Sequence, residues 1–164
     1  TTGQAKVLAM QDRIALIHPQ CRVDAVDDFV TPNNWPDVLP VQPDAVIDAC
    51  DQVRAKTALA HWALTEGVPL VSVGAAGGKQ MAQAVEVADL AETTHDPLLA
   101  QLRYRLRKHH GAARFGRMGV TCVFSRESVM QPTPDAQTTA RQSPRLANKT
   151  SLPRTRTIRA VEPL

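Results

Sequence analysis

The sequence predicts an α/β fold in which helices cover a Rossmann-like, largely parallel sheet. Two observations support this class. Apolar residues alternate between helical and strand-like spacing from residue 5 to residue 124. In the middle of that stretch, an expected strand at 44–49, a helix at 52–65 and a strand at 69–73 follow one another. Such a βαβ unit joins parallel strands through a crossover helix.

One helix and one strand are expected before this unit. Residues 5–17 carry apolar side chains near helical spacing, and the segment ends before Pro19, so it is predicted to be helical. Residues 22–26 alternate as a strand does. The passage at 27–36, which is rich in Asp, Asn and Pro, then predicts turns.

After the βαβ unit, whose helix should end at Gly67, two more strands and a helix are expected. The strands are predicted at 83–87 and 119–124, on either side of a helix at 97–110. Asp96 is expected to cap this helix, because Asp before Pro is a common helix start.

The chain is expected to divide near Met130. Residues 131–164 contain five prolines and scattered basic residues without a periodic apolar face. We therefore expect a folded domain over 1–130 and a disordered, Pro/Arg-rich tail over 131–164.

Composition narrows the class of protein. No segment approaches the roughly 20 apolar residues of a membrane span, so no membrane partner is expected. The three cysteines, Cys21, Cys50 and Cys122, form no CxxC pair, which argues against a disulfide framework and against a zinc site. A reducing cytoplasm is the expected location. Each cysteine is expected to be a buried structural thiol, and a reactive thiol is the alternative.

Charge is divided unevenly along the chain. Residues 1–96 carry six Lys/Arg and thirteen Asp/Glu, whereas 97–164 carry thirteen Lys/Arg and three Asp/Glu. No acid lies between Pro97 and Arg126. The basic helix and the loop after it therefore predict either a solvated surface or a contact for an anionic partner such as RNA. The candidate RNA-binding residues are Arg103, Arg105, Arg107, Lys108, Arg114 and Arg117.

Two features lie where parallel strands should end, the edge at which α/β sheets bind ligands. Asp51 is a candidate ligand for a metal ion or nucleotide, or simply the N-cap of the next helix. The loop at 74–78 follows a strand as a phosphate-binding loop would, but it matches neither GxGxxG nor GxxxxGK[ST]. A permissive turn explains it equally well. Lys6, taken alone, is typical of a surface lysine.

Several segments in order resemble one known family. They are Val26 to Asn34, Val46 to Asp51 with Val53 to Lys56, Pro69 to Val71 running into Gly74 to Gly78, Asp96 to Leu98, and Gly119 to Ser125. The chain resembles the central portion of the tRNA threonylcarbamoyladenosine dehydratases, bacterial members of the ThiF/MoeB superfamily, which is related to ubiquitin-activating enzymes. The resemblance covers about residues 3–130 and implies a ThiF-type sheet.

This resemblance implies ATP-dependent ring closure on tRNA. ATP would activate the carboxylate of threonylcarbamoyladenosine as an adenylate, and intramolecular attack would expel AMP. By position, Lys6 would contact ATP phosphates, and Asp51 would act in catalysis and hold Mg²⁺. Arg54, Gly74, Gly77 and Gly78 would line the same pocket. The resemblance also implies a tRNA contact, a homodimer, a monovalent cation (Na⁺ or K⁺) as a candidate cofactor, and a cysteine desulfurase system as a candidate partner.

The sequence departs from the family pattern in two ways that affect the expected ATP binding and activity. The family's Gly-rich nucleotide loop should precede residue 1, so the sheet is expected to be incomplete at its N-terminus. The tail after Met130 also differs from the family's apolar C-terminal segment. We therefore expect the 164-residue chain alone to bind ATP weakly or not at all, and to be inactive.

The sequence is also compatible with two alternative functions. One is an adenylyltransferase of the ThiF or MoeB type that activates a ubiquitin-like sulfur carrier, although those relatives usually carry two zinc-binding CxxC pairs. The other is an inactive fragment that binds RNA or another partner through residues 97–117.

Overall fold

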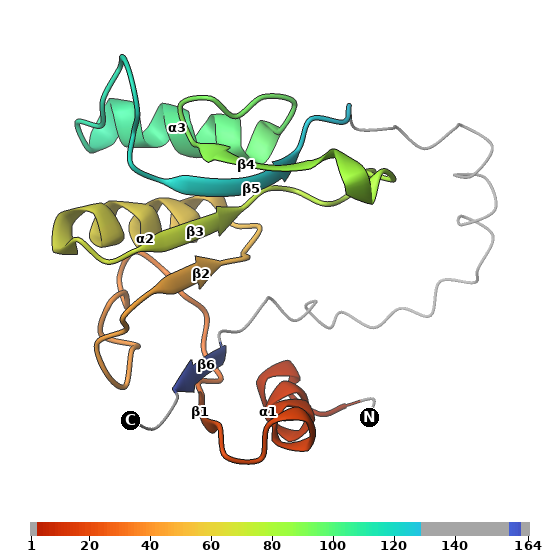
Figure 1. The fold of residues 1–164 in the computed structure, drawn as a ribbon. Helices are drawn as coiled ribbons and strands as arrows, with labels where there is room; N and C mark the ends of the chain where they lie inside the picture. The colour runs from red at the N-terminus through yellow and green to blue at the C-terminus, as the bar shows by residue number, and fades with distance from the viewer. Residues whose placement is uncertain (1–2, 129–157, 162–164) are drawn as a thin grey trace, which may run out of the picture.

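The computed structural model describes residues 3–128 and 158–161, which form two sheets and their helices (Figure 1). The larger sheet has the strand order β2-β3-β5-β4, and the smaller one pairs β1 with β6. The helices are α1 (Lys6–Ile17), α2 (Val53–Glu66) and α3 (Pro97–His109), with a short 3-10 helix, η1 (Ala82–Ala84). The strands are β1 (Arg22–Ala25), β2 (Val46–Asp48), β3 (Leu70–Val73), β4 (Val85–Asp89), β5 (Thr121–Ser125) and β6 (Ile158–Val161).

The predicted βαβ unit is confirmed. Strand β2 pairs with β3 in parallel, with α2 between them in sequence, and β5 pairs with β3 in parallel as well. Helix α2 ends at Gly67, whose φ of 69° lies in the left-handed region that favours glycine. The α/β class and the Rossmann-like, largely parallel sheet are therefore as expected.

Strand β4 is the exception, because it runs antiparallel to β5. The connection at 74–84 contains only η1, whereas a parallel strand needs a crossover of about a dozen residues, usually helical. The chain therefore turns back at the sheet edge where β3 ends. The strand expected at 83–87 also begins two residues later, because η1 occupies the start of that segment.

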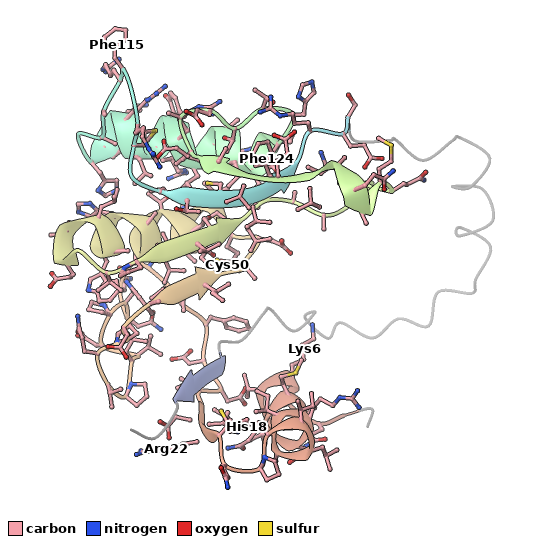
Figure 2. All side chains as sticks on the ribbon, in the orientation of Figure 1. Lys6, His18, Arg22, Cys50, Phe115 and Phe124 are labelled. Carbon is pink, nitrogen blue, oxygen red and sulfur yellow. The ribbon has the colours of Figure 1, made fainter. Side chains whose placement is uncertain are left out.

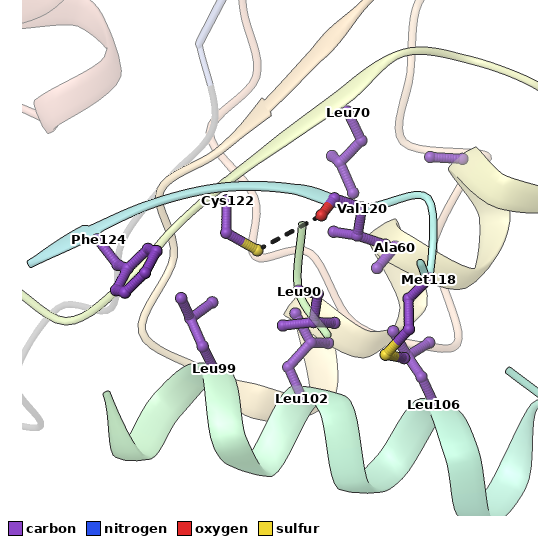
Figure 3. Packing of buried hydrophobic residues seen from close by; sticks show 11 residues of the cluster. Ala60, Leu70, Leu90, Leu99, Leu102, Leu106, Met118, Val120, Cys122 and Phe124 are labelled. Carbon is purple, nitrogen blue, oxygen red and sulfur yellow. Dashed lines mark hydrogen bonds between the residues drawn. The ribbon is translucent and has the colours of Figure 1, made fainter. Parts of the chain in front are cut away.

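The core lies between the larger sheet and the helices α2 and α3. Leu99, Leu102 and Leu106 of α3 point toward the sheet, and they belong to one buried cluster with Cys122 and Phe124 of β5 (Figure 3). Ala60 and Ala63 of α2, with Leu70, Leu90, Met118 and Val120, complete this buried cluster.

The first helix and strand lie apart from this core. Helix α1 contacts β1 and β6, and β1 pairs with β6 antiparallel, with Arg22 opposite Val161. Strand β6 falls within the segment predicted to be disordered, so residues 158–161 depart from that expectation. Residues 131–157 and 162–164 lie outside the described residues, and for them the disordered tail stays a prediction. Within the described ranges, no helix is long and apolar enough to cross a membrane.

Candidate functional site

The carboxyl ends of β2, β3 and β5 meet at one edge of the larger sheet, because the three strands are parallel. Asp51 follows β2, Gly74 follows β3, and Arg126 follows β5. This is the edge at which ligands bind in α/β folds. The structure therefore places two of the predicted features, Asp51 and the glycine loop, at the ends of neighbouring strands.

A fully buried ion pair joins these two strand ends. Lys56 of α2 is 0% exposed, and its Nζ donates to Asp48 Oδ2 at 2.7 Å. The same Nζ donates to Ser72 Oγ at 3.2 Å and to the carbonyl of Val73 at 2.9 Å. Ser72 Oγ in turn donates to Asp48 Oδ2 at 2.9 Å. The ammonium group of Lys56 thus connects the end of β2 to the end of β3 through hydrogen bonds.

Lys56 was not predicted to be a core residue, although its position in the sequence indicates burial. Lys56 precedes Leu59, Ala60 and Ala63 at the i+3, i+4 and i+7 positions, which is the buried face of α2. A lysine on that face requires a carboxylate partner, and Asp48 at the end of the preceding strand supplies it.

Cys50 is tied to the same carboxylate. Its thiol donates to Asp48 Oδ1 at 2.8 Å, and its backbone N–H donates to the same oxygen at 3.1 Å. Burial, together with the charge of Asp48, raises the pKa of Cys50 to about 12. The thiol is therefore protonated at neutral pH and acts as a hydrogen-bond donor, which agrees with the expectation of a structural thiol.

Asp51 is not a helix cap. The N-cap of α2 is Gln52, and no side chain caps the helix. Asp51 is exposed, and no hydrogen bond or ion pair engages its carboxylate within residues 3–128. Arg54, in the first turn of α2, is likewise exposed. Of the two acids near the end of β2, Asp48 forms an ion pair with Lys56, whereas Asp51 is exposed and can contact a ligand.

The glycine loop is held against the start of α3. A Cβ on Gly74 would lie 2.2 Å from Asp96 Oδ2, so only glycine fits there. Asp96 caps α3, as predicted, by accepting from Leu99 N at 2.9 Å, and its other oxygen accepts from Ala75 N at 2.8 Å. Gly77 and Gly78 are exposed farther along the loop. Of the predicted glycines, Gly74 therefore has a demonstrated steric role.

A second set of contacts holds the far end of this loop. Lys79 Nζ donates to the carbonyls of His95 and Ser125, at 3.0 and 3.1 Å, and to that of Glu127. The Glu127 carboxylate accepts from the N–H groups of Met81 and Gln80, and these bonds lower its pKa. The segment after β5 thus closes over the loop, and neither Lys79 nor Glu127 was predicted to take part.

The structure does not bring Lys6 to this edge by any contact. Lys6 begins α1 and is exposed, and Figure 2 shows it on a different part of the molecule from Cys50. Across the described ranges, no hydrogen bond or ion pair links it to α2 or to the glycine loop. Its assignment to ATP phosphates stays a prediction.

Asp51 is the candidate ligand at this edge for the implied Mg²⁺. The described part of the chain has no group of three or more His, Cys, Asp or Glu residues that could hold a metal ion. Mg²⁺ is commonly bound through one or two carboxylates together with substrate phosphates and waters. Asp51 alone therefore fits a metal that arrives with a nucleotide, and it does not fit a permanently bound one.

The predicted basic surface separates into two groups of residues. In the first group, the side chain makes contacts inside the protein that stabilise the fold. Arg103 Nη1 donates to the carbonyls of Leu90 and Thr93 at 3.0 and 2.8 Å, and Arg107 Nε donates to the carbonyl of Ala113 at 3.0 Å. These bonds hold the loops on either side of α3.

Arg117 also has an internal partner, since its Nε lies 3.8 Å from Asp89 Oδ2. Burial alone would raise the pKa of Asp89, but hydrogen bonds from the N–H groups of Met118, Ala91 and Gly119 lower it. Asp89 therefore serves as a buried anion that fixes the turn before β5, and Arg117 lies at its exposed side.

In the second group, Arg105, Lys108 and Arg114 have no carboxylate partner in the described part of the chain. Lys108 Nζ lies 5.4 Å from the ring centroid of Tyr104. Lys108, Tyr104 and Arg114 line a surface hollow of about 340 Å³ together with Ala100, Arg103 and Arg107. These cations are available to an anionic partner.

Comparison with known proteins defines the class. The profile of the ThiF family matches residues 1–144, so this chain belongs to the ThiF family. Within it, the chain is 45% identical over 135 residues to the tRNA threonylcarbamoyladenosine dehydratase of Escherichia coli, covering 81% of this chain and 50% of that protein. It is 35% identical over 134 residues to the Haemophilus influenzae protein of the same name, covering 80% and 51%.

Solved structures agree with this assignment. The crystal structure of the E. coli dehydratase superposes with a TM-score of 0.73 at 46% identity, covering 77% of this chain and 54% of that one. The same protein in complex with ATP gives a TM-score of 0.75 at 45% identity, covering 79% and 54%. The chain thus spans about half the length of the relatives it matches.

Proposed function

We propose that this chain forms part of a tRNA threonylcarbamoyladenosine dehydratase. Such an enzyme transfers the adenylyl group of ATP to the carboxylate of threonylcarbamoyladenosine in tRNA, with release of pyrophosphate. Intramolecular attack on the activated carboxyl carbon then releases AMP and leaves a cyclic, dehydrated product. The observation that carries the proposal is the identity to the bacterial dehydratases, which extends over four fifths of the chain.

Activation of the carboxylate is the step that the edge of the sheet would serve. A carboxylate is a poor electrophile until it carries a leaving group, and adenylyl transfer requires cations that neutralise the phosphates. Asp51 would hold Mg²⁺ as it arrives with ATP, and the bound ion would neutralise phosphate charge. Arg54 and the loop of Gly74, Gly77 and Gly78 would line the same pocket, and Lys6 is proposed to contact the phosphates.

The buried ion pair supports this role for Asp51. Asp51 lies three residues after Asp48, and Lys56 fixes Asp48 to the end of β3, from which the glycine loop begins. A rigid base for both groups keeps their separation constant, and electrostatic stabilisation of a transition state depends on such preorganisation.

The proposed substrate is tRNA, and the exposed basic residues of α3 and the following loop would contact its phosphates. Of the six residues predicted for this role, Arg105, Lys108 and Arg114 have no carboxylate partner among the residues that the structure describes. A homodimer, a monovalent cation and a cysteine desulfurase partner stay predictions.

An adenylyltransferase for a ubiquitin-like sulfur carrier is the remaining alternative enzyme. The lack of CxxC pairs in the sequence speaks against it. An inactive RNA- or partner-binding fragment is the second alternative. RNA binding by the 164-residue chain that does not change when ATP is added would support this second alternative.

The test uses the parent protein with threonylcarbamoyladenosine-containing tRNA and ATP. Mass spectrometry of the digested tRNA should show loss of one water from the modified nucleoside, together with release of AMP. Asp51→Asn should lower the rate about 100-fold or more, as removal of one electrostatic stabiliser does. Asp44→Asn, which changes an exposed acid before β2, is the matched control and should leave the rate unchanged.

Two results would reject the proposal. One is unchanged tRNA while AMP is transferred to the C-terminus of a small protein, which would favour the alternative enzyme. The other is an Asp51→Asn variant as active as the wild type. Calorimetry of the 164-residue chain with ATP tests the expectation of weak binding separately, and micromolar affinity would contradict it.

A further inference from the structure

Two aromatic side chains stand exposed within the basic surface. Tyr104 lies on α3 and is 60% exposed, and Phe115 lies in the loop between α3 and β5 and is 92% exposed. Figure 2 shows Phe115 at the tip of that loop, pointing away from the sheet. Neither ring belongs to the core cluster. Phe115 therefore exposes a large apolar surface that makes no contribution to the core.

The two rings are interleaved with Lys108 and Arg114, which have no carboxylate partner in the part of the chain that the structure describes. Lys108 follows Tyr104 by one turn of α3 and lies over its ring, 5.4 Å from the centroid. Arg114 immediately precedes Phe115 and lines the same hollow as Tyr104 and Lys108. Aromatic rings beside unpaired cations are the combination that proteins use to bind single-stranded nucleic acid.

The hollow beside Tyr104 has walls that hydrogen bonds hold in place. Arg103 and Arg107 line it, and their bonds to the carbonyls of Leu90, Thr93 and Ala113 hold them in place. Its volume of about 340 Å³ lies at the lower end of the range that accommodates a small-molecule group. A planar base therefore has space beside the Tyr104 ring, with positive charge around the rim.

We propose that Tyr104 and Phe115 stack on unpaired bases of an RNA strand whose phosphates contact Lys108 and Arg114. The inference deepens the proposed function, on which it rests, by specifying that the RNA is recognised through a single-stranded loop. An acidic protein surface would also meet the cations. It offers no flat π-system to two exposed rings, so the aromatic residues favour RNA.

The test measures binding of the 164-residue chain to a fluorescein-labelled, single-stranded RNA by anisotropy, without ATP. Tyr104→Ala and Phe115→Ala should each weaken binding about tenfold, which corresponds to about 1.4 kcal/mol. Tyr104→Phe and Phe115→Tyr retain a ring and should bind as the wild type does. Leu16→Ala, which removes an exposed apolar side chain on α1, is the matched control and should have no effect.

A second measurement separates stacking from charge. An abasic oligomer of equal length keeps every phosphate and removes every base. It should bind to the wild type more weakly than the intact RNA binds to either alanine variant, because both stacking contacts are lost. Lys108→Ala should instead reduce the slope of log K against log salt by about 0.7, as loss of one phosphate contact on a single strand does. Unchanged melting temperatures would show that these exposed substitutions leave the fold intact.

The proposal is overturned if the alanine variants bind RNA as the wild type does, or if the abasic oligomer binds equally well. It is also overturned if a polyglutamate peptide of matched charge competes as effectively as RNA, because a protein partner would then be favoured. None of these measurements requires turnover. A parent protein that fails to dehydrate threonylcarbamoyladenosine but discriminates against the abasic strand would reject the proposed function and retain this one.

Discussion

At the scale of single residues, Lys56 shows how a charged side chain can belong to a core. A buried ion pair is costly to desolvate and is stable only when further hydrogen bonds complete it. Here Ser72 and the carbonyl of Val73 supply these bonds. The result is a rigid connection between two strand ends, one of which leads to Asp51.

We expect Lys56→Met to destabilise the fold by about 3 to 5 kcal/mol, because Asp48 would remain buried without a counter-charge. Urea denaturation measures the change. Arg54→Met, which replaces an exposed cation two positions earlier, is the matched control, with an expected change within about 0.5 kcal/mol. The double variant Asp48→Asn/Lys56→Met should recover part of the loss. Equal stabilities of the Lys56 and Arg54 variants would contradict this account.

At the scale of elements, the sheet edge is assembled by contacts between loops and helix starts. Asp96 caps α3 and at the same time binds the backbone of Ala75. Lys79 and Glu127 connect the far end of the same loop to the segment after β5. The glycine loop is therefore positioned at both ends by side chains that are distant in sequence.

Gly74→Ala should destabilise the protein by about 1 to 3 kcal/mol, because the added methyl group would lie 2.2 Å from Asp96 Oδ2 and 3.1 Å from Phe124 Cβ. Gly77→Ala, in the same loop, is the control. A Cβ there has no neighbour within 4 Å, and its φ lies outside the left-handed region, so stability should be unchanged or slightly higher. Thermal melting of both variants provides the comparison, and similar losses in the two would refute the steric explanation.

At the scale of the whole molecule, two thiols make stability depend on alkaline pH. Burial raises the pKa of both Cys50 and Cys122 from 9.0 to about 12. Above pH 9 the unfolded chain loses these protons while the folded chain keeps them, so the free energy of unfolding falls as pH rises. Below pH 9 this contribution is fully present.

We expect the free energy of unfolding of the wild type to fall more steeply above pH 9 than that of the Cys50→Ser/Cys122→Ala variant. Serine keeps the donor to Asp48, and neither replacement titrates in this range. Urea denaturation at several pH values between about 8 and 10.5 gives the two slopes. Parallel curves would show that the thiols do not contribute.

Local patterns predicted most of the elements, because spacing, caps and glycines act within a few residues. The Asp96 cap of α3 and the Gly67 terminus of α2 are confirmed. The antiparallel direction of β4 and the pairing of β1 with β6 were not predicted, since both depend on how distant segments meet. Asp51 was predicted at the correct edge, but its freedom from a capping role follows only from the structure.

The sequence by itself determined the α/β class and the basic character of residues 97–117, because composition and periodicity are properties of the local chain. Membership of the ThiF family follows from the family profile, which matches residues 1–144. Tertiary structure alone decided which charges are available to a ligand. Lys56 and Asp48 neutralise each other in the core, and Arg103 and Arg107 bind carbonyls. Asp51, Lys108 and Arg114, by contrast, are exposed and form no ion pair among the residues that the structure describes. The physical reason is that a charge buried on folding must find a partner, and only the packed chain determines which charges are buried.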